Sequence, residues 1–296
     1  MIKYGKQLVQ LTAIVISLVC VTACSDTKSV TNDGRSIPSL TQKWVINGSF
    51  TSPESAFYDQ ARGVVYVSNV AGYTDNGLGY ISTINLDGEL IEERWLEGIN
   101  APTGMAIAGD ILYVADFNRL VSVDISSASI SIIQVYDVDA ENPGMNDVTI
   151  SPAGDVFVSA SAISSIYQLK DGQLALWAQS DELQFANGLF ADDDYLYVAG
   201  YFLRRLGLDS REIEKFGDDE MLIDLESIET DHAGGFFVSQ IGDKPIMHVT
   251  AEGGVSELLE TGTFTADMDY VHQRSILVAP SGGNTVSGFA VHWDEN

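Results

Sequence analysis

A four-residue pattern, an apolar residue, an aromatic or apolar residue, Val, and then Ser or Ala, occurs six times along the chain. The starts of successive copies are separated by 47, 44, 40, 40 and 40 residues; the copies are Val65–Ser68, Leu112–Ala115, Val156–Ser159, Leu196–Ala199, Phe236–Ser239 and Ile276–Ala279. Recurrence at a period of about 40 residues is typical of repeat architectures, in which each repeat is one supersecondary unit. The period therefore limits the fold to a ring or an array of similar units.

Each copy of the pattern predicts a buried strand, because it is short, rich in β-branched and aromatic residues, and bounded by Gly or Asp. Turn signals between the copies, at Asp87-Gly88, Asp171-Gly172 and Gly253-Gly254, predict further strands. Sustained helical periodicity is missing from the sequence beyond the N-terminal segment. About four strands per repeat correspond to one propeller blade. We therefore predict an all-β, six-bladed β-propeller, with an open solenoid as the alternative.

The two ends of the repeat region predict how the ring closes. Only Thr285–Trp293 follows the sixth copy, which leaves room for one more strand, so the last blade lacks its outermost member. The segment Lys43–Phe50, which precedes the first copy, can supply that strand. We expect these segments to pair, because closure removes exposed strand edges.

The N-terminus predicts export. Lys3 and Lys6 precede an apolar stretch that runs from Leu8 to Val21. This stretch is shorter than the roughly 20 residues that span a bilayer, which favours a cleaved signal peptide over a transmembrane helix. We assign the signal peptide to residues 1–23.

The residues that end this segment, Val21-Thr22-Ala23-Cys24, resemble a bacterial lipobox, in which Cys24 is lipidated; an ordinary signal peptide with a chance cysteine is the alternative. Residues 24–40 are polar and predict a flexible tether, which leaves 41–296 for the propeller. Ser25 after a lipidated cysteine is compatible with export to the outer membrane in such lipoproteins. We expect a lipoprotein of the bacterial envelope that contacts the membrane through its lipid alone, with the domain in the periplasm or at the cell surface.

The formal net charge of the chain is -27 at pH 7. Such a surface repels phosphate backbones, so nucleic acid is excluded as a partner, whereas cations are attracted. Solubility in a salty medium accounts for most of the acidic residues without any binding site.

Alignment of the six repeats reveals a polar position at the start of each predicted innermost strand, occupied by Glu54, Thr103, Asn146, Asn187, Glu226 and Asp267. In a closed propeller the same repeat position recurs around the central axis, so these side chains are expected to converge at one mouth of the channel. Three carboxylates brought together out of water repel one another unless a positive charge lies among them.

A hard cation suits this set of oxygen donors. Calcium accepts six to eight oxygens from carboxylates, amides and water, whereas zinc prefers His or Cys, which the aligned position lacks. We predict Ca²⁺, or another hard divalent cation, with Asn187 as a neutral ligand. The alternative is that these residues cap strand starts and bind channel waters without a metal.

Four segments resemble the SMP-30/gluconolactonase/LRE-like six-bladed propellers, relatives of calcium-dependent lactonases, paraoxonases and organophosphate hydrolases: Pro53–Asp59, Met145–Asp147, Ala186–Leu189 and Leu225–Glu229. The resemblance extends from about Ser52 to the end of the chain. It implies that Glu54, Asn187 and Glu226 are metal ligands and that Asn146 contacts metal or substrate.

The resemblance also implies metal-assisted hydrolysis of a lactone or ester. In that mechanism Glu226, or the nearby carboxylate Asp267, takes a proton from water, while Asn146 and Thr103 contact the substrate. Two positions depart from the family. The hydrolases usually have Asp where this chain has Glu226, and sugar lactonases have Arg where it has Gly144, which disfavours gluconolactone as the substrate.

A non-catalytic binding propeller of the cell envelope, with a structural metal in the channel, is the competing hypothesis. Loop residues would then contact a ligand or protein partner; the candidates are Tyr73, Tyr201, Phe202, Arg204 and Arg205.

Nucleophilic catalysis is disfavoured, since the chain has no Gly-x-Ser-x-Gly motif and the four histidines are expected away from the aligned position; these are His232, His248, His272 and His292. Asp192-Asp193-Asp194 predicts a hairpin turn rather than a calcium loop.

Overall fold

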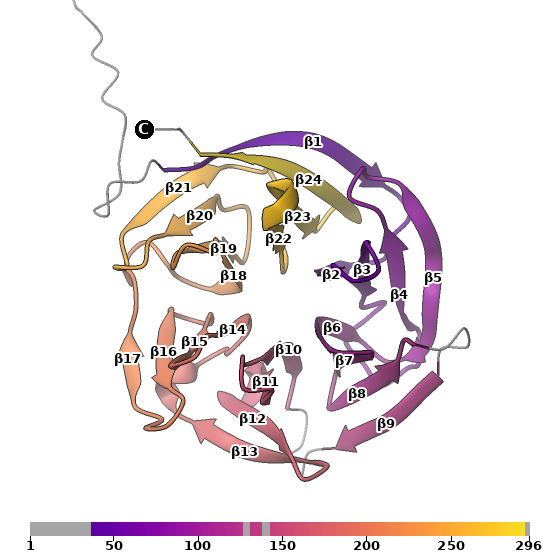
Figure 1. The fold of residues 1–296 in the computed structure, drawn as a ribbon, viewed down its shortest axis with the longest axis horizontal. Helices are drawn as coiled ribbons and strands as arrows, with labels where there is room; N and C mark the ends of the chain where they lie inside the picture. The colour runs from indigo at the N-terminus through magenta and orange to yellow at the C-terminus, as the bar shows by residue number, and fades with distance from the viewer. Residues whose placement is uncertain (1–36, 127–130, 138–142, 294–296) are drawn as a thin grey trace, which may run out of the picture.

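The computed structural model of the chain describes residues 37–126, 131–137 and 143–293. It contains six four-stranded antiparallel sheets arranged as blades around a central axis (Figure 1). No α-helix occurs within these ranges, which hold only three short 3-10 turns, η1 (Ser161–Ile163), η2 (Asp181–Leu183) and η3 (His272–Arg274). The predicted six-bladed β-propeller is confirmed.

Each blade is built from strands that follow one another from the axis outward. The first two blades are β2 (Pro53–Asp59), β3 (Val64–Asn69), β4 (Gly79–Ile84), β5 (Leu90–Ile99), and β6 (Pro102–Ala108), β7 (Ile111–Asp116), β8 (Arg119–Asp124), β9 (Ser131–Asp137). The third and fourth are β10 (Met145–Ile150), β11 (Val156–Ala160), β12 (Ser165–Lys170), β13 (Gln173–Gln179), and β14 (Leu189–Ala191), β15 (Tyr195–Val198), β16 (Arg204–Gly207), β17 (Ile213–Lys215). The fifth is β18 (Leu225–Thr230), β19 (Phe236–Gln240), β20 (Ile246–Val249), β21 (Val255–Leu259), and the sixth is β22 (Asp269–Val271), β23 (Ile276–Ser281), β24 (Thr285–His292) with β1 (Ser39–Asn47).

The repeated sequence pattern marks the second strand of every blade. Its copies lie on β3, β7, β11, β15, β19 and β23, with only Ala199 just beyond the end of its strand. Their alternate side chains are almost completely buried, as Val65 and Val67 illustrate at 0% exposure. Both faces of a second strand are covered by neighbouring blades, so β-branched and aromatic residues are favoured at every position.

The hydrophobic core consists of six clusters, and each cluster lies between two neighbouring blades. One joins the fourth and fifth blades through the packed rings of Tyr197, Phe216 and Phe236. Another joins the sixth and first blades and includes Phe50 and Val286. Stability therefore depends on every blade retaining both of its neighbours.

Ring closure occurs as predicted, by antiparallel pairing of β1 with β24 (Figure 1). The pairing runs from Ser39 opposite His292 to Asn47 opposite Thr285, so the closing strand begins and ends earlier in the sequence than the predicted Lys43–Phe50. The Trp44 indole nitrogen donates a hydrogen bond to the carbonyl oxygen of Leu86 at 2.9 Å. The closing strand is thus attached to the first blade as well as to the sixth.

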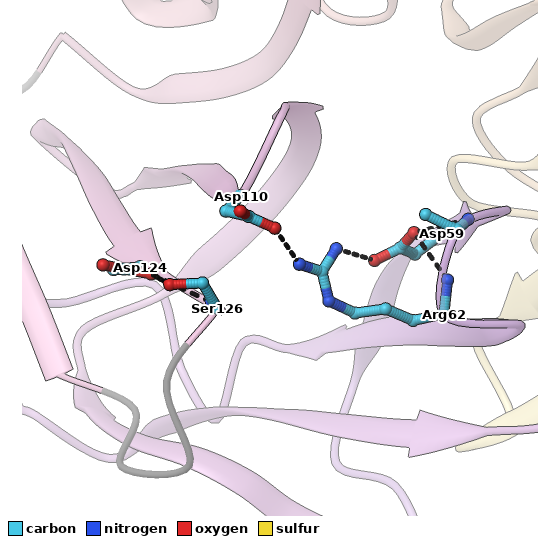
Figure 2. A network of polar contacts seen from close by, with 6 residues as sticks. Asp59, Arg62, Asp110, Asp124 and Ser126 are labelled. Atoms are coloured by element: carbon cyan, nitrogen blue, oxygen red, sulfur yellow. Dashed lines mark hydrogen bonds and ion pairs between the residues drawn. The ribbon is translucent and has the colours of Figure 1, made fainter.

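An ion-pair network connects the first two blades at the end of β2 (Figure 2). Arg62 donates to Asp59 Oδ2 at 2.8 Å and also pairs with Asp110 of the second blade. Asp124 nearby accepts from the backbone and hydroxyl of Ser126 (Figure 2). Because Asp110 is 61% exposed, we expect this pair to contribute little to stability.

The predicted signal peptide, the lipidation site Cys24 and most of the predicted tether lie outside the described residues. β1 begins at Ser39, two residues inside the segment assigned to the tether. Within the part that the structure describes, no helix has the length and apolarity to cross a membrane.

Candidate active site

The strand starts that carry the aligned polar position are irregular in four of the six blades. The pairing of the innermost strand shifts register between Pro53 and Ala56, Pro102 and Met105, Met145 and Val148, and Leu225 and Ser227. A β-bulge redirects side chains and commonly occurs next to active sites. Glu54, Thr103, Asn146 and Glu226 lie within these irregularities. In the remaining blades, Asn187 and Asp267 precede the first residues of β14 and β22.

Backbone hydrogen bonds join neighbouring blades at the same level. The Asp267 amide donates to the Glu54 carbonyl oxygen at 2.8 Å, and the Gly188 amide donates to the Glu226 carbonyl oxygen at 3.0 Å. A Cβ at Gly188 would lie 2.9 Å from that same carbonyl oxygen, so this position requires glycine. These contacts hold the aligned residues of adjacent blades against one another.

Two buried carboxyl groups meet at the channel axis. Glu54 and Glu226 are only 6% and 5% exposed, and their side chains hydrogen bond with each other. Asn187 Nδ2 donates to Glu226 Oε2 at 2.9 Å, and the Tyr73 hydroxyl hydrogen bonds with Glu54. The structure therefore brings together Glu54, Asn187 and Glu226, which come from the first, fourth and fifth blades. Tyr73, predicted only as a loop residue of a binding surface, joins them.

Burial and mutual repulsion control the protonation of this pair. Burial raises the pKa of Glu226 well above its usual range, and the charges of Glu54 and Asp267 raise it further. Burial also raises the pKa of Glu54, against the hydrogen bonds from Glu226 and Tyr73. Burial and the neighbouring Glu54 raise the pKa of Tyr73, which therefore remains a hydrogen-bond donor. Because the two carboxyl groups interact directly, they titrate as a pair, and a bound cation would favour the charged form of both.

Asp267 lies between this pair and a second acidic group. Its carboxylate accepts a hydrogen bond from the Ser55 hydroxyl at 2.9 Å, and its charge acts on both Glu54 and Glu226. It also lines a cavity of about 250 Å³ located further along the innermost strands, together with Asp147, Glu229 and Asp269.

The acids of this deeper cavity connect one blade to the next. Asp147 Oδ2 accepts from the Leu189 amide at 2.6 Å, Asp269 accepts from the Tyr58 amide, and Glu229 accepts from the Tyr270 amide. In each case the acid and the amide belong to adjacent blades. We assign these acids a structural role. The sequence did carry a signal for these acids, because the aligned repeat segments contain acidic residues inside otherwise apolar strands.

Burial raises the pKa of Asp147 and of Asp269 to about 7. Since the pKa of an unfolded Asp is about 3.9, the folded state binds more protons than the unfolded state between these values. The stability from these groups is therefore complete below about pH 4 and is lost as pH rises through about 7. We expect the free energy of unfolding, measured by denaturant titration in chelator, to fall between pH 5 and pH 8.

Asp269→Asn tests this assignment. Between pH 5 and pH 8 the variant should lose less unfolding free energy than the wild type, by on the order of 2 kcal/mol, since one group contributes about 1.4 kcal/mol for each pH unit between its two pKa values. Asp209→Asn changes an exposed acid and is the matched control. An identical pH dependence in wild type and Asp269→Asn would contradict the assignment.

Asn146 and Thr103 line a different, adjoining cavity of about 440 Å³. Thr103 is 2% exposed, and its hydroxyl donates to the carbonyl oxygens of Ala115 and Met145, each at 3.4 Å. Asn146 is half-buried. Tyr73 connects the two regions, because it lines this cavity and hydrogen bonds with Glu54. Of the four predicted metal ligands, three are linked by hydrogen bonds and Asn146 lies in the neighbouring wall.

The donor set fits a hard cation. Within the described ranges, no group of three or more His, Cys, Asp or Glu side chains is arranged to hold a metal ion. The predicted ligand set has only two carboxylates and completes its donors with amides. The residues that line the two channel cavities include no Lys, Arg or His that could neutralise the pair. Oxygen donors of this kind suit calcium better than zinc.

The histidines lie away from the aligned position, as expected. His248 is buried, with Nε2 at 3.0 Å from Asp231 Oδ2. His232 and His272 follow the ends of β18 and β22, opposite the strand starts, with ring centroids 5.1 Å apart. His292 is exposed at the end of β24.

Arg204 and Arg205, which were predicted as loop residues, are instead the first two residues of β16, and both are paired with acids. Arg204 Nη1 lies 2.9 Å from Asp219 Oδ1, and its guanidinium lies over the ring of Phe202. Arg205 Nη2 lies 2.7 Å from Glu214 Oε2. These contacts give the arginines a structural role and argue against ligand contact through them.

The predicted turn at Asp192–Asp194 is present. Asp192 Oδ1 accepts from the amides of Asp194 at 2.8 Å and Tyr195 at 2.6 Å, as in an Asx-type turn.

No family model and no curated protein matches the chain. Solved structures do. The chain is similar to a gluconolactonase from Xanthomonas campestris, with a TM-score of 0.65 and 12% identity over 88% of this chain and 90% of that one. For a putative gluconolactonase the TM-score is 0.64 and the identity 18%, over 88% of this chain and 94% of that one. For a streptogramin B lyase the TM-score is 0.64 and the identity 10%, over 86% of this chain and 98% of that one. At these identities the likeness establishes a shared propeller fold.

Proposed function

We propose that the chain is a hydrolase of lactones or esters that acts with a hard divalent cation, calcium being the first candidate. The observation that carries this proposal is the buried Glu54–Glu226 pair, which is bonded to Asn187 and adjoins a cavity large enough for a small molecule. Two solved propellers of similar fold are described as a gluconolactonase and a putative gluconolactonase, which supports the same reaction class.

Glu54, Asn187 and Glu226 would hold the cation, with Asn146 as a further ligand or a substrate contact. When bound, the cation would polarise the substrate carbonyl and stabilise developing negative charge on its oxygen. The protein's own groups must then position the substrate and transfer the proton.

Glu226 is the first candidate to accept a proton from water, and Asp267 is the second. Each carboxyl group is fixed by a hydrogen bond beside the proposed cation site, and a positioned carboxylate can act as a general base. The Asn187 amide fixes one Glu226 oxygen, and the Ser55 hydroxyl fixes one Asp267 oxygen. Tyr73 holds Glu54 in place by donating to it.

The adjoining cavity favours an uncharged substrate. Asn146, Thr103 and Ser161 supply polar side-chain atoms, although the Thr103 and Ser161 hydroxyls are engaged with backbone carbonyls. No described lining residue is basic, and Gly144 occupies the position where the resemblance would place an arginine. A neutral lactone or ester suits these walls better than an anionic substrate or a polyhydroxylated sugar lactone.

Turnover is the direct test. Purified protein loaded with calcium should hydrolyse members of a panel of lactones and aryl esters, and chelation should abolish the activity. Complete inactivity against such a panel, by calcium-loaded protein shown to be folded, would refute the proposal.

Glu54→Gln should lower calcium affinity by roughly tenfold or more, because it removes one of two charged ligands and leaves a neutral amide. Isothermal titration of the apo-protein with Ca²⁺ measures this change without relying on activity. Glu92→Gln, an exposed acid on β5, is the matched control and should bind calcium as the wild type does. Equal affinity in Glu54→Gln and wild type would place the cation elsewhere.

A further inference from the structure

The cavity beside the carboxyl pair is largely apolar. It has a volume of about 440 Å³, within the range of small-molecule sites, and no charged side chain lines it. Its walls include Tyr73, Thr103, Phe117, Gly144, Asn146 and Phe185. The Ser161 hydroxyl donates to the Ala186 carbonyl oxygen at 2.6 Å, so it is already engaged with the backbone.

Two aromatic residues of this cavity have unusual backbone conformations. Phe117, between β7 and β8, has φ of 62°, and Phe185, ahead of β14, has φ of 55°. A positive φ is uncommon for residues other than glycine and is costly for bulky ones. Backbone bonds hold Phe117 itself and the residue before Phe185, since the Phe117 carbonyl oxygen accepts from Met145 N at 2.7 Å and the Gln184 carbonyl oxygen accepts from Tyr201 N at 2.8 Å. Two separate blades thus bear strain that places aromatic rings in one cavity.

The aromatic rim is exposed to solvent. Tyr73 is 58% exposed and Phe185 is 54% exposed, so both leave apolar surface in water. Antiparallel strands alternate in direction, so the start of the first strand and the end of the second strand of a blade lie at the same end of that blade. The segments that precede first strands and the loops that follow second strands are therefore at the channel mouth. Other exposed apolar side chains lie in these segments, namely Leu78, Tyr201, Met221 and Ile241. Exposed apolar side chains therefore surround the channel mouth, interspersed with exposed acids such as Asp75, Asp218 and Asp243.

Small residues keep the cavity open on its other side. Gly144 has φ of +62°, and a Cβ there would lie 3.2 Å from the Ala162 Cβ. Ala162, in η1, is exposed and contributes only a methyl group to the wall. Larger residues at either position would occupy the space next to Asn146.

We propose that this cavity is the specificity pocket of the site and binds the apolar part, an alkyl chain or aromatic ring, of an uncharged lactone or ester. The inference rests on the proposed function and names its substrate class. Tyr73 couples the two parts, because its ring lines the pocket while its hydroxyl bonds with Glu54. An apolar substituent in the pocket would place the attached carbonyl beside the Glu54–Glu226 pair.

Lactams test the pocket without requiring turnover, because they resemble lactones but resist hydrolysis. Calcium-loaded protein is titrated calorimetrically with δ-lactams that carry no substituent, a butyl chain or an octyl chain. Affinity should rise by roughly fourfold for each methylene that enters the pocket, and then level off when the pocket is full. Affinity that does not depend on chain length would overturn the proposal.

Two variants locate the binding. Ala162→Leu fills the pocket and should shorten the chain length at which affinity levels off, and Phe185→Ser should weaken octyl-lactam binding by roughly tenfold with little change for the unsubstituted lactam. Tyr201→Ser removes an exposed aromatic of the same face outside the pocket and is the matched control. An equal loss of affinity in Phe185→Ser and Tyr201→Ser would contradict the assignment.

The same chain-length series of δ-lactones separates the pocket from the chemistry. Specificity constants that rise with chain length in parallel with lactam affinity support both proposals. If lactam binding depends on chain length but no lactone is hydrolysed, the pocket proposal stands and the hydrolase proposal is refuted. If lactones are hydrolysed at rates that do not depend on chain length, the hydrolase proposal stands and the pocket proposal is overturned.

Discussion

Glu226→Gln will lower kcat/KM for lactone or ester hydrolysis by roughly 10³-fold, while the propeller remains folded. The substitution keeps the size and hydrogen-bonding shape of the side chain but removes the group proposed to accept a proton from water. General acid–base catalysis by a positioned side chain contributes about 10²- to 10⁴-fold, and the loss of a charged metal ligand adds to the effect. Initial-rate kinetics at saturating calcium measure the change.

Stability should not decrease with this substitution. The charge of a buried Glu226 is penalised by desolvation and by the neighbouring Glu54, whereas glutamine carries no charge. Its amide oxygen can accept from Asn187 Nδ2, and its amide nitrogen can donate to Glu54, as the protonated acid does. We expect an unfolding free energy equal to or above that of the wild type at pH 8, so a loss of activity cannot be attributed to misfolding.

Glu229→Gln is the matched control for this experiment. Glu229 is also a channel carboxyl group with a pKa raised by burial, but it accepts from the Tyr270 amide and does not contact the Glu54–Glu226 pair. Its turnover should stay within a few-fold of wild type. Equal activity of Glu226→Gln and Glu229→Gln would refute the catalytic role of Glu226 and favour the envelope-binding propeller, whose partner binding should survive either substitution.

The fold could be predicted from the sequence because propeller geometry repeats. The second strand of each blade is buried between neighbours, so burial imposes the same residue types six times, as Val65–Ser68 and Ile276–Ala279 show. The missing outer strand of the last blade was predictable for the same reason. Alignment of the repeats could therefore predict contacts that follow from the ring geometry alone, such as the hydrogen bond between Asn187 and Glu226.

The rest of the site depends on features that are not repeated. Bulges at the strand starts shift register by amounts that the sequence does not specify, so the alignment could not predict that Asn146 lies in a neighbouring wall rather than against Glu54. Tyr73 lies in the loop between β3 and β4, whose path has no counterpart in the other blades. The left-handed conformations of Phe117 and Phe185 are imposed by tertiary contacts against the intrinsic preference of phenylalanine.

Deletion of residues 41–50 will lower the melting temperature by roughly 10 °C or more, or abolish cooperative folding. The deletion removes most of β1, exposes the edge of β24 and breaks the attachment of the sixth blade to the first. It also removes Trp44, Ile46 and Phe50 from the cluster between those blades. A loss of 5 kcal/mol corresponds to roughly 10–20 °C for a domain of this size.

Two point substitutions on β1 separate ring closure from a general effect of truncation. Trp44→Ala removes the hydrogen bond to the Leu86 carbonyl oxygen and the ring that covers Gly88 and Gly288, so we expect a cost of about 2–4 kcal/mol. Val45→Ala changes the next residue, whose side chain is 44% exposed, and should cost about 0.5 kcal/mol or less. Denaturant titration distinguishes these values. If the deletion and both substitutions unfold as the wild type does, the ring is held closed by contacts between blade faces alone, and β1 is dispensable.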